Sequence, residues 1–190
     1  MKRFCIGIIL ITAVTMLGME AHALSLTPAD CTVGDCWTTL DNSQPTADAI
    51  ELLVGTSTDL TMLYKSESGA ADGSGYDSGS FASSYNTFFS NSHTDPEDAL
   101  IEYIGGASIV CPECYLTVKD GHHSPALYAF NISSWNGLDD IVLKGFWPGG
   151  GAISNVAIWG VVTSVPEPGT LGMFGSILIG LVALRRRAYK

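Results

Sequence analysis

The hydrophobic pattern of this 190-residue chain shows a long apolar run near each end and a middle part of short apolar segments. The first long run covers residues 4–19 and the second covers residues 169–184. Between them, short apolar stretches alternate with segments rich in Gly, Ser, Asn and Pro. Short segments bounded by turn residues are typical of β-strands, whereas long uncharged runs are typical of targeting or membrane segments.

In the middle part, the pattern predicts strands and no helix. Tyr128, Phe130 and Ile132 alternate with Ala129 and Asn131, so they share one face of a strand. Residues 66–80 consist mainly of Gly, Ser, Ala and Asp and are expected to form a flexible loop. The expected strands are residues 49–55, 60–65, 81–89, 100–104, 108–111, 115–119, 127–132, 141–143 and 153–162.

This pattern predicts an all-β fold, an antiparallel β-sandwich or jelly roll, because many short strands are separated by regular turns. Its core would take much of its apolar area from large aromatic side chains. The aromatic residues expected there are Trp135, Phe146, Trp147 and Trp159.

The N-terminal run has the layout of a secretory signal peptide. Lys2 and Arg3 precede the apolar stretch, and Ala21 and Ala23 place small residues at the two positions that signal peptidase reads. We therefore predict a signal peptide over residues 1–23, passage through the Sec translocon and cleavage after Ala23. An uncleaved anchor or a buried helix is the alternative, and the shortness of the run disfavours it.

The C-terminal run predicts a single transmembrane helix. Its sixteen uncharged residues would extend about 24 Å as a helix, and flanking arginine side chains can reach the interface to span the remainder. Arg185, Arg186 and Arg187 follow directly and should stay in the cytoplasm, which places the middle part outside. A core helix of a soluble domain is the alternative.

Val165, Pro166, Glu167 and Pro168 precede this run. With the apolar run and the arginine cluster, they resemble the PEP-CTERM sorting signal of Gram-negative bacteria, here over residues 165–190. The resemblance implies that exosortase, a membrane-embedded cysteine protease, recognises Pro166, Glu167 and Pro168 and removes the tail. It also implies a role beside exopolysaccharide and biofilm production. The protein would be anchored in the inner membrane before processing and would then reach the cell surface or the extracellular matrix.

A second resemblance covers residues 107–160. The segments 118–121, 136–137, 145–148 and 151–154 are similar to a recurrent ectodomain of PEP-CTERM proteins. It implies a common architecture and supplies no catalytic residue.

The expected ectodomain, residues 24–164, is strongly acidic. Three lysines stand against seventeen carboxylates, which gives a net charge of −14. Such a surface repels nucleic acid and anionic lipid headgroups, so nucleic acid is excluded as a partner.

Four cysteines remain after removal of the leader: Cys31, Cys36, Cys111 and Cys114. In an oxidising compartment an even number predicts two disulfides, with three possible pairings, of which the two local ones are preferred because they are nearest in sequence. A four-thiolate zinc site and a redox-active Cys-x-x-Cys are the alternatives. The redox alternative needs a helix N-terminus, whereas residues 115–118 predict a strand.

Other chemical candidates are weak. Asp72, Asp77, Asp95 and Asp98 lie in acidic loops that could attract calcium but lack EF-hand spacing. His122 and His123 are adjacent, so their side chains point to opposite faces of an extended chain. The Gly-Tyr-Asp-Ser-Gly sequence at residues 75–79 lacks the residue pattern of a serine-protease loop. No catalytic residue, metal or cofactor is therefore assigned.

Three functions fit these observations. The leading hypothesis is a non-enzymatic surface or matrix protein sorted by exosortase. The second is a carbohydrate-binding module contacting exopolysaccharide through aromatic side chains. The third is a glycan-active hydrolase, for which no pair of carboxylates is nominated. The aromatic candidates for sugar stacking are Tyr64, Tyr76, Tyr85 and Trp135.

Overall fold

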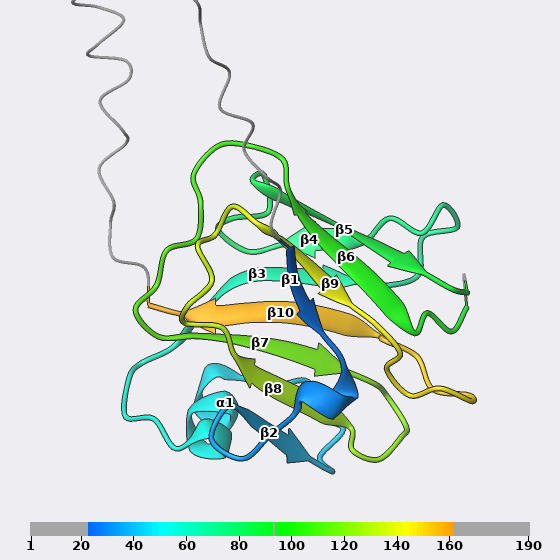
Figure 1. Cartoon of the computed structure of the whole chain (residues 1–190), viewed down its shortest axis with the longest axis horizontal. Coiled ribbons are helices and arrows are strands. Elements are labelled where there is room, and N and C mark those ends of the chain that lie inside the picture. Colours follow the sequence, from blue (N-terminus) through cyan, green and yellow to red (C-terminus); the bar gives the residue numbers. More distant parts are fainter. Residues whose placement is uncertain (1–22, 93, 162–190) are drawn as a thin grey trace, which may run out of the picture.

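A computed structural model describes residues 23–92 and 94–161, in which short strands form two β-sheets packed face to face (Figure 1). The elements in chain order are β1 (Ala23–Leu26), η1 (Pro28–Asp30), β2 (Cys36–Thr39), α1 (Ala47–Val54), β3 (Thr61–Glu67), β4 (Tyr76–Ser78), β5 (Tyr85–Ser90), β6 (Asp98–Tyr103), β7 (Cys114–Lys119), β8 (Leu127–Asn131), β9 (Asp140–Leu143) and β10 (Asn155–Gly160).

The smaller sheet has the strand order β1-β9-β6-β5, and the larger has the order β2-β8-β7-β10-β3-β4. The strands pair antiparallel throughout both sheets except that β1 runs parallel to β9. The all-β prediction is confirmed at this level, and the choice between a sandwich and a jelly-roll topology stays a prediction.

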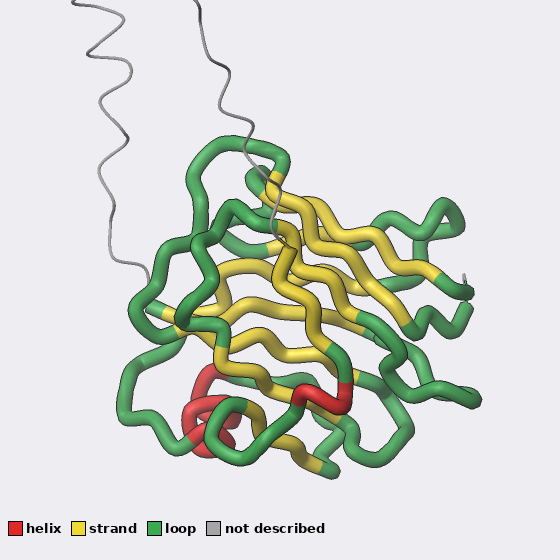
Figure 2. The backbone as a smooth tube through the Cα atoms, viewed as in Figure 1, coloured by secondary structure: helices red, strands yellow, loops and turns green. Residues whose placement is uncertain are grey.

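The core has two parts because the larger sheet is covered on both faces. Between the sheets, Tyr128, Phe130 and Ile132 point the same way, as the alternation predicts, and pack with residues such as Leu116 and Ile158. On the outer face, a second cluster packs beneath α1: Ile50, Val54, Leu60, Tyr115, Leu127, Ala129, Ala157 and Trp159. Strands β7 and β10 are consequently buried along their whole length. In Figure 2, α1 is the coiled red segment at the lower left, next to β2, and the other red segment is η1.

The strand expected at residues 49–55 is wrong, because this segment is the helix α1. Thr46 caps its N-terminus by accepting a hydrogen bond from the backbone N–H of Ala49 at 3.3 Å, and Gly55 ends it with a φ of 76°. Ile50 and Val54 stand four residues apart and are both buried, whereas Leu52 is 85% exposed. This spacing is that of an amphipathic helix, so the expectation of no helix in the middle part is also wrong.

The loop expected at residues 66–80 is partly wrong. Strand β3 continues to Glu67, and residues 76–78 form the edge strand β4 against it. Gly79 can lie against β3 because it has no side chain and a φ of 101°; a Cβ atom there would lie 2.6 Å from the carbonyl oxygen of Leu63. Close backbone approach therefore orders a segment whose composition indicates flexibility.

Residues 108–111 form no strand, although their apolar pattern predicts one. Ile109 is fully buried, and its backbone N–H donates to the Tyr85 hydroxyl at 2.7 Å. That hydroxyl in turn donates to the carbonyl oxygen of Gly137 at 2.7 Å. The buried Tyr85 hydroxyl thus accepts the hydrogen bond from a backbone N–H group that would otherwise pair with a neighbouring strand.

The sandwich has two distinct ends, which we call the exit end and the far end. At the exit end, Ala23 opens β1, and Gly160 closes β10 opposite Cys114. At the far end, Lys119 closes β7 opposite Asn155. Figure 1 shows that the chain enters and leaves the fold at the exit end.

Candidate functional site

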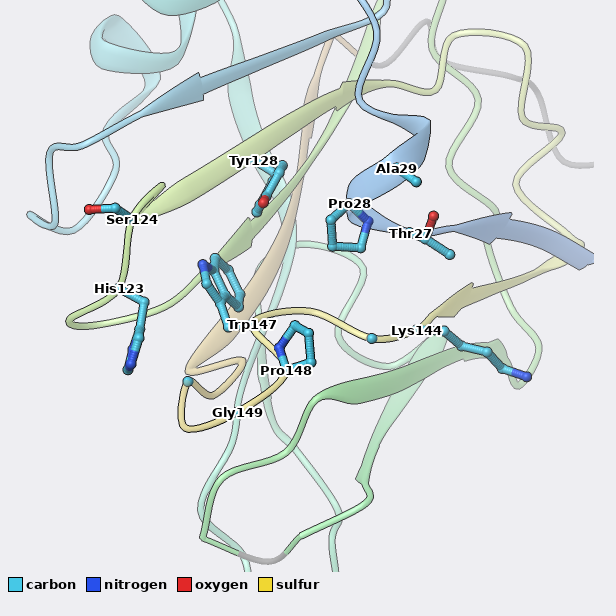
Figure 3. A pocket seen from close by; sticks show the side chains of 12 residues that line it. Thr27, Pro28, Ala29, His123, Ser124, Tyr128, Lys144, Trp147, Pro148 and Gly149 are labelled. Atoms are coloured by element: carbon cyan, nitrogen blue, oxygen red, sulfur yellow. The ribbon is translucent and has the colours of Figure 1, made fainter.

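A cleft of about 680 Å³ opens at the far end of the sandwich (Figure 3). Its walls come from residues 27–29 after β1, residues 123–124 between β7 and β8, and residues 144–151 between β9 and β10, together with Tyr128. These segments are distant in sequence. They meet because β1, β7 and β9 all end at the far end.

The first wall is a short, capped turn. The backbone N–H and the hydroxyl of Thr27 both donate to Asp30 Oδ2, at 2.8 and 2.7 Å, and Pro28 occupies the first position of η1, where its missing N–H costs nothing. The backbone N–H of Lys144 donates to the carbonyl oxygen of Leu26 at 3.1 Å. The first and third walls are therefore tied together by main-chain contact.

The second wall is organised by the buried carboxylate of Asp120. It accepts hydrogen bonds from the backbone N–H groups of His122 at 2.7 Å and Ala152 at 2.8 Å, and His123 Nδ1 lies 3.0 Å from its Oδ2. Burial tends to raise the pKa of Asp120, but these hydrogen bonds and the His123 ring outweigh burial and lower the pKa below its usual value. Asp120 therefore holds two walls of the cleft together as an anion.

The third wall is built around Trp147, whose backbone has a φ of 52°. Its indole N–H donates to the carbonyl oxygen of Pro125 at 2.7 Å, and its ring centroid lies 5.4 Å from that of Tyr128. Gly151 lies so close that an added Cβ would stand 2.6 Å from Asp120 Oδ2 and would also collide with Trp147. The turn of residues 147–151 is thus held by the Trp147 side chain and by the close backbone approach at Gly151.

Tyr128 presents a polar group at the floor of the cleft. Burial alone raises the pKa of its hydroxyl, and none of the hydrogen bonds within residues 23–92 and 94–161 uses that hydroxyl. Figure 3 shows Tyr128 with Trp147 and Pro28 around one hollow. This combination of apolar walls and a hydroxyl without a protein partner can accept a ligand that has both apolar faces and polar edges.

The residues that line the cleft are not acidic themselves, but carboxylates lie directly behind them, since Asp30, Asp98 and Asp120 contact lining residues. Among the described residues that line it, none is Asp or Glu, and Lys144 and His123 are its ionisable basic groups. Figure 3 shows these two residues on opposite sides of the hollow, with the Lys144 side chain directed away from Trp147 and Tyr128.

Lys144 differs from the other two lysines of the domain. It is exposed and has no ion pair within the described part of the chain. Lys65 pairs with Glu67 at 2.5 Å. Lys119 is 3% exposed and donates to the carbonyl oxygen of Asp120 at 2.9 Å.

The four predicted cysteines form two local disulfides, Cys31–Cys36 and Cys111–Cys114. The first closes the loop before β2, and the second joins the two residues that precede and begin β7. The disulfide prediction is confirmed, with the local pairing, and the two pairs occupy the thiolates that a four-thiolate zinc site would use.

The four aspartates considered for calcium serve separate local contacts. Asp72 accepts from the backbone N–H and hydroxyl of Ser74, Asp77 accepts from the Tyr64 hydroxyl at 2.6 Å, and Asp98 accepts from the backbone N–H of Gly145 at 2.8 Å. Asp95 accepts a long hydrogen bond from Thr94. Within residues 23–92 and 94–161, no group of three or more His, Cys, Asp and Glu side chains is arranged to hold a metal.

The residues considered for serine chemistry are separated in the fold. Ser78 lies in the edge strand β4, where its hydroxyl contacts the carbonyl oxygen of Lys65 at 3.4 Å. His123 stands instead at the cleft beside Asp120, and His122 is exposed and contributes its backbone N–H there. His93 lies outside the described residues.

Two of the four aromatic residues considered for sugar stacking are buried. Tyr64 is 0% and Tyr85 is 1% exposed, and burial raises the pKa of the Tyr85 hydroxyl to about 12. Trp135 is half-buried and donates its indole N–H to the carbonyl oxygen of Asp139. Tyr76 is 61% exposed on β4.

The sequence did not reveal Tyr128 and Trp147 as cleft residues, since both also fit the expected core. Trp147 is indeed buried, as are Phe146 and Trp159. The one available signal for the cleft was the Trp-Pro-Gly-Gly-Gly sequence of residues 147–151, which interrupts the strand pattern.

The sorting residues Pro166, Glu167, Pro168, Arg185, Arg186 and Arg187 lie outside the described residues, as does Ala21. Ala23 is the exposed first residue of β1 and pairs with Asp140. Within the described residues, no helix is both long and apolar enough to cross a membrane.

Comparison with known protein families matches residues 164–187 to the PEP-CTERM protein-sorting motif. The match begins after the last described residue of the fold and covers the Pro-Glu-Pro sequence, the apolar run and the arginine cluster. No curated protein and no solved structure matches the chain. The resemblance of residues 107–160 to a recurrent ectodomain therefore stays a prediction.

Proposed function

We propose that this exported protein, which carries a PEP-CTERM sorting motif, is a non-enzymatic component of the extracellular matrix associated with exopolysaccharide. The observation that carries the proposal is the sorting motif at residues 164–187, which implies exosortase processing. The two disulfides support it, because they suit a domain that works in an oxidising compartment.

The proposed route has three steps. The Sec translocon exports the chain, and signal peptidase cleaves after Ala23. The apolar segment 169–184 then holds the domain at the inner membrane, with Arg185, Arg186 and Arg187 on the cytoplasmic side. Exosortase finally cleaves near Pro166 to Pro168 and releases the domain to the surface or matrix.

The mass of the mature protein tests this route. We expect protein from cells with exosortase to lack residues 185–190, and protein from cells without exosortase to keep them and remain in the membrane fraction. A Glu167→Ala variant should behave in wild-type cells as the unaltered protein does without exosortase. A mature mass that includes residues 185–190 in wild-type cells would contradict tail removal.

A carbohydrate-binding module is the second candidate function, and the cleft favours it. Aromatic and proline side chains can pack on the apolar faces of a sugar ring, and the Tyr128 hydroxyl can bind its edge. We expect the anchored protein, purified in detergent from the membranes of cells without exosortase, to be retained on immobilised polysaccharide from the same species. Tyr128→Ala should reduce that retention, whereas Tyr76→Ala, at an exposed tyrosine outside the cleft, should not.

Enzymatic turnover tests the non-enzymatic part of the proposal. The purified protein should release no reducing ends from the host polysaccharide and no alcohol from ester substrates. Release of either product, abolished by Asp120→Asn or His123→Gln, would establish a glycan-active hydrolase instead.

A further inference from the structure

The exit end carries exposed apolar side chains on two loops that contain no charged residue. Ile104, Val110 and Leu138 are 60%, 40% and 47% exposed, and we call these three residues the apolar rim. They stand in residues 104–112 and 131–138, where no Asp, Glu, Lys or Arg occurs. Single exposed apolar residues are ordinary, whereas several gathered on uncharged loops indicate a contact surface.

The two loops lie against each other. Gly137 approaches Ile109 so closely that an added Cβ would stand within 3.3 Å of three backbone atoms of Ile109. This approach brings the segment of Leu138 beside the segment of Val110. Strand β6 runs antiparallel to β9, so Ile104, just after β6, lies at the same end as Leu138, shortly before β9. The three rim residues are therefore gathered at the exit end.

The rim lies beside the point at which the chain leaves the fold. Gly160, the last residue of β10, lies against Cys111, which follows Val110; an added Cβ at Gly160 would stand 2.8 Å from Cys111 Sγ. Figure 1 shows the loop between β6 and β7 at the end of the fold where β1 begins and β10 ends. Residues 162–168 separate the described fold from the apolar segment 169–184, and seven residues extend at most about 25 Å. A chain anchored by that segment therefore keeps the rim close to the lipid surface.

The size and charge of this surface favour a lipid partner. Three partly exposed aliphatic side chains are too few for a stable protein interface, which buries about 1,200–2,000 Å². A lipid surface needs no such area, because the anchor already supplies a high local concentration. Carboxylates border the two loops at Glu102, Glu113, Asp139 and Asp140, so the rim does not attract anionic headgroups and suits a zwitterionic surface.

Resting on the anchoring by residues 169–184 proposed above, we propose that the apolar rim docks the domain on the zwitterionic lipid surface of its own membrane. Ile104, Val110 and Leu138 enter the boundary between headgroups and acyl chains, where exposed aliphatic side chains are removed from water. The rim and the tail together hold the domain upright, so the cleft at the far end faces away from the bilayer.

Quenching of a fluorophore by spin-labelled lipid tests this docking in the full anchored protein. Ala107 is exposed in the first rim loop, so an Ala107→Cys variant carries the fluorophore there without replacing a rim residue. The protein is purified from cells without exosortase and reconstituted in phosphatidylcholine vesicles that contain spin-labelled phosphatidylcholine. We expect quenching at this position. The same fluorophore on Ser43→Cys, beyond the far end of β2, should stay unquenched.

Changing all three rim residues to Ser in the Ala107→Cys background should lower the ratio of docked to undocked protein about tenfold, because the apolar contact with lipid is lost. The matched control changes three other exposed apolar residues, Leu40, Leu52 and Tyr76, to Ser and should be quenched as the wild type is. Exchanging half of the lipid for phosphatidylglycerol should weaken quenching at low salt, since the domain is strongly acidic. Circular dichroism of each variant verifies that it is folded.

The outcomes separate this inference from the proposed function. Retention of the full chain on carbonate-washed vesicles tests the anchor, and quenching at residue 107 tests the rim. Retention without quenching, or quenching unchanged in the rim variant, overturns the docking and leaves the anchor. Stronger quenching in phosphatidylglycerol overturns the assignment of zwitterionic lipid. Loss of the full chain in the wash contradicts both the anchor and this inference.

Discussion

The carboxylate of Asp120 offers the sharpest test of how the far end is held together. Its side chain is 5% exposed and accepts from the backbone N–H groups of His122 and Ala152, which belong to different walls of the cleft. Replacing Asp120 with Ala leaves both donors without a partner, and each costs about 1–3 kcal/mol where water cannot reach it. Partial access of water at the exposed His122 reduces the total, so we expect a loss of about 2–4 kcal/mol.

The isosteric Asp120→Asn variant keeps one acceptor oxygen and should lose about 1–2 kcal/mol. The contact with His123 adds little, since that ring is 45% exposed and water screens the pair. Urea unfolding of the purified protein at about pH 7 measures these differences as shifts of the unfolding midpoint at constant slope. Asp59→Asn, at an exposed carboxylate, is the matched control and should unfold as the wild type does.

The pH dependence gives a second, independent readout. The pKa of Asp120 is lowered in the folded state, whereas in the unfolded chain it takes the usual value of about 3.9. Its contribution to stability is therefore fully present above about pH 4 and is lost as the pH falls through the folded-state pKa. The gap between wild type and Asp120→Asn should narrow toward about pH 3. An Asn variant as stable as the wild type at about pH 7, or a gap that widens in acid, would refute the reasoning.

Three further predictions concern the fold. Ile50→Ala should destabilise the domain by about 2–4 kcal/mol because Ile50 is 1% exposed beneath α1, whereas Leu52→Ala should change stability by less than about 0.5 kcal/mol because Leu52 is 85% exposed; equal effects in urea unfolding would show that α1 packs differently. Gly55→Ala should cost about 1 kcal/mol, since a φ of 76° strains any side chain, and a midpoint at or above that of the wild type would argue against this cap. Replacing both Cys31 and Cys36 with Ser should cost roughly 2 kcal/mol through the loss of a short closed loop, and mass spectrometry of the intact protein, with and without reductant, should show one disulfide instead of two.

The strands of the middle part were predictable where one rule governs them. Alternation in residues 127–132 correctly placed Tyr128, Phe130 and Ile132 on one face. The rule holds there because one face of β8 packs between the two sheets and the other packs beneath α1. The same reasoning failed at residues 49–55, where the spacing of the apolar residues fits a strand and a helix alike. The deciding signals were Thr46 and Gly55, which cap α1 at its two ends.

The cleft could not be predicted because it depends on contacts between distant segments. Lys144 is one of three lysines in residues 24–164, and only the fold distinguishes it from Lys119, which is buried, and Lys65, which is paired. Asp120 likewise appeared as a turn residue before Gly121. Its role arises from the backbone N–H of Ala152, thirty-two positions further along the chain.

If the C-terminal segment anchors the domain as proposed, the opposition of the two ends of the sandwich has a consequence for copies that share one membrane. Each chain leaves its fold at the exit end, and each cleft opens at the far end. Anchored copies would thus form a two-dimensional array of clefts, and a polymer that repeats its ligand unit can bind several of them at once. Such multivalent binding can exceed the affinity of one site by about 10²–10⁴-fold. A weak single site would therefore suffice while the tail is present. Removal of the tail by exosortase, as proposed, would disperse the array, and tail cleavage would then act as a switch from strong collective capture to weak, exchangeable contact.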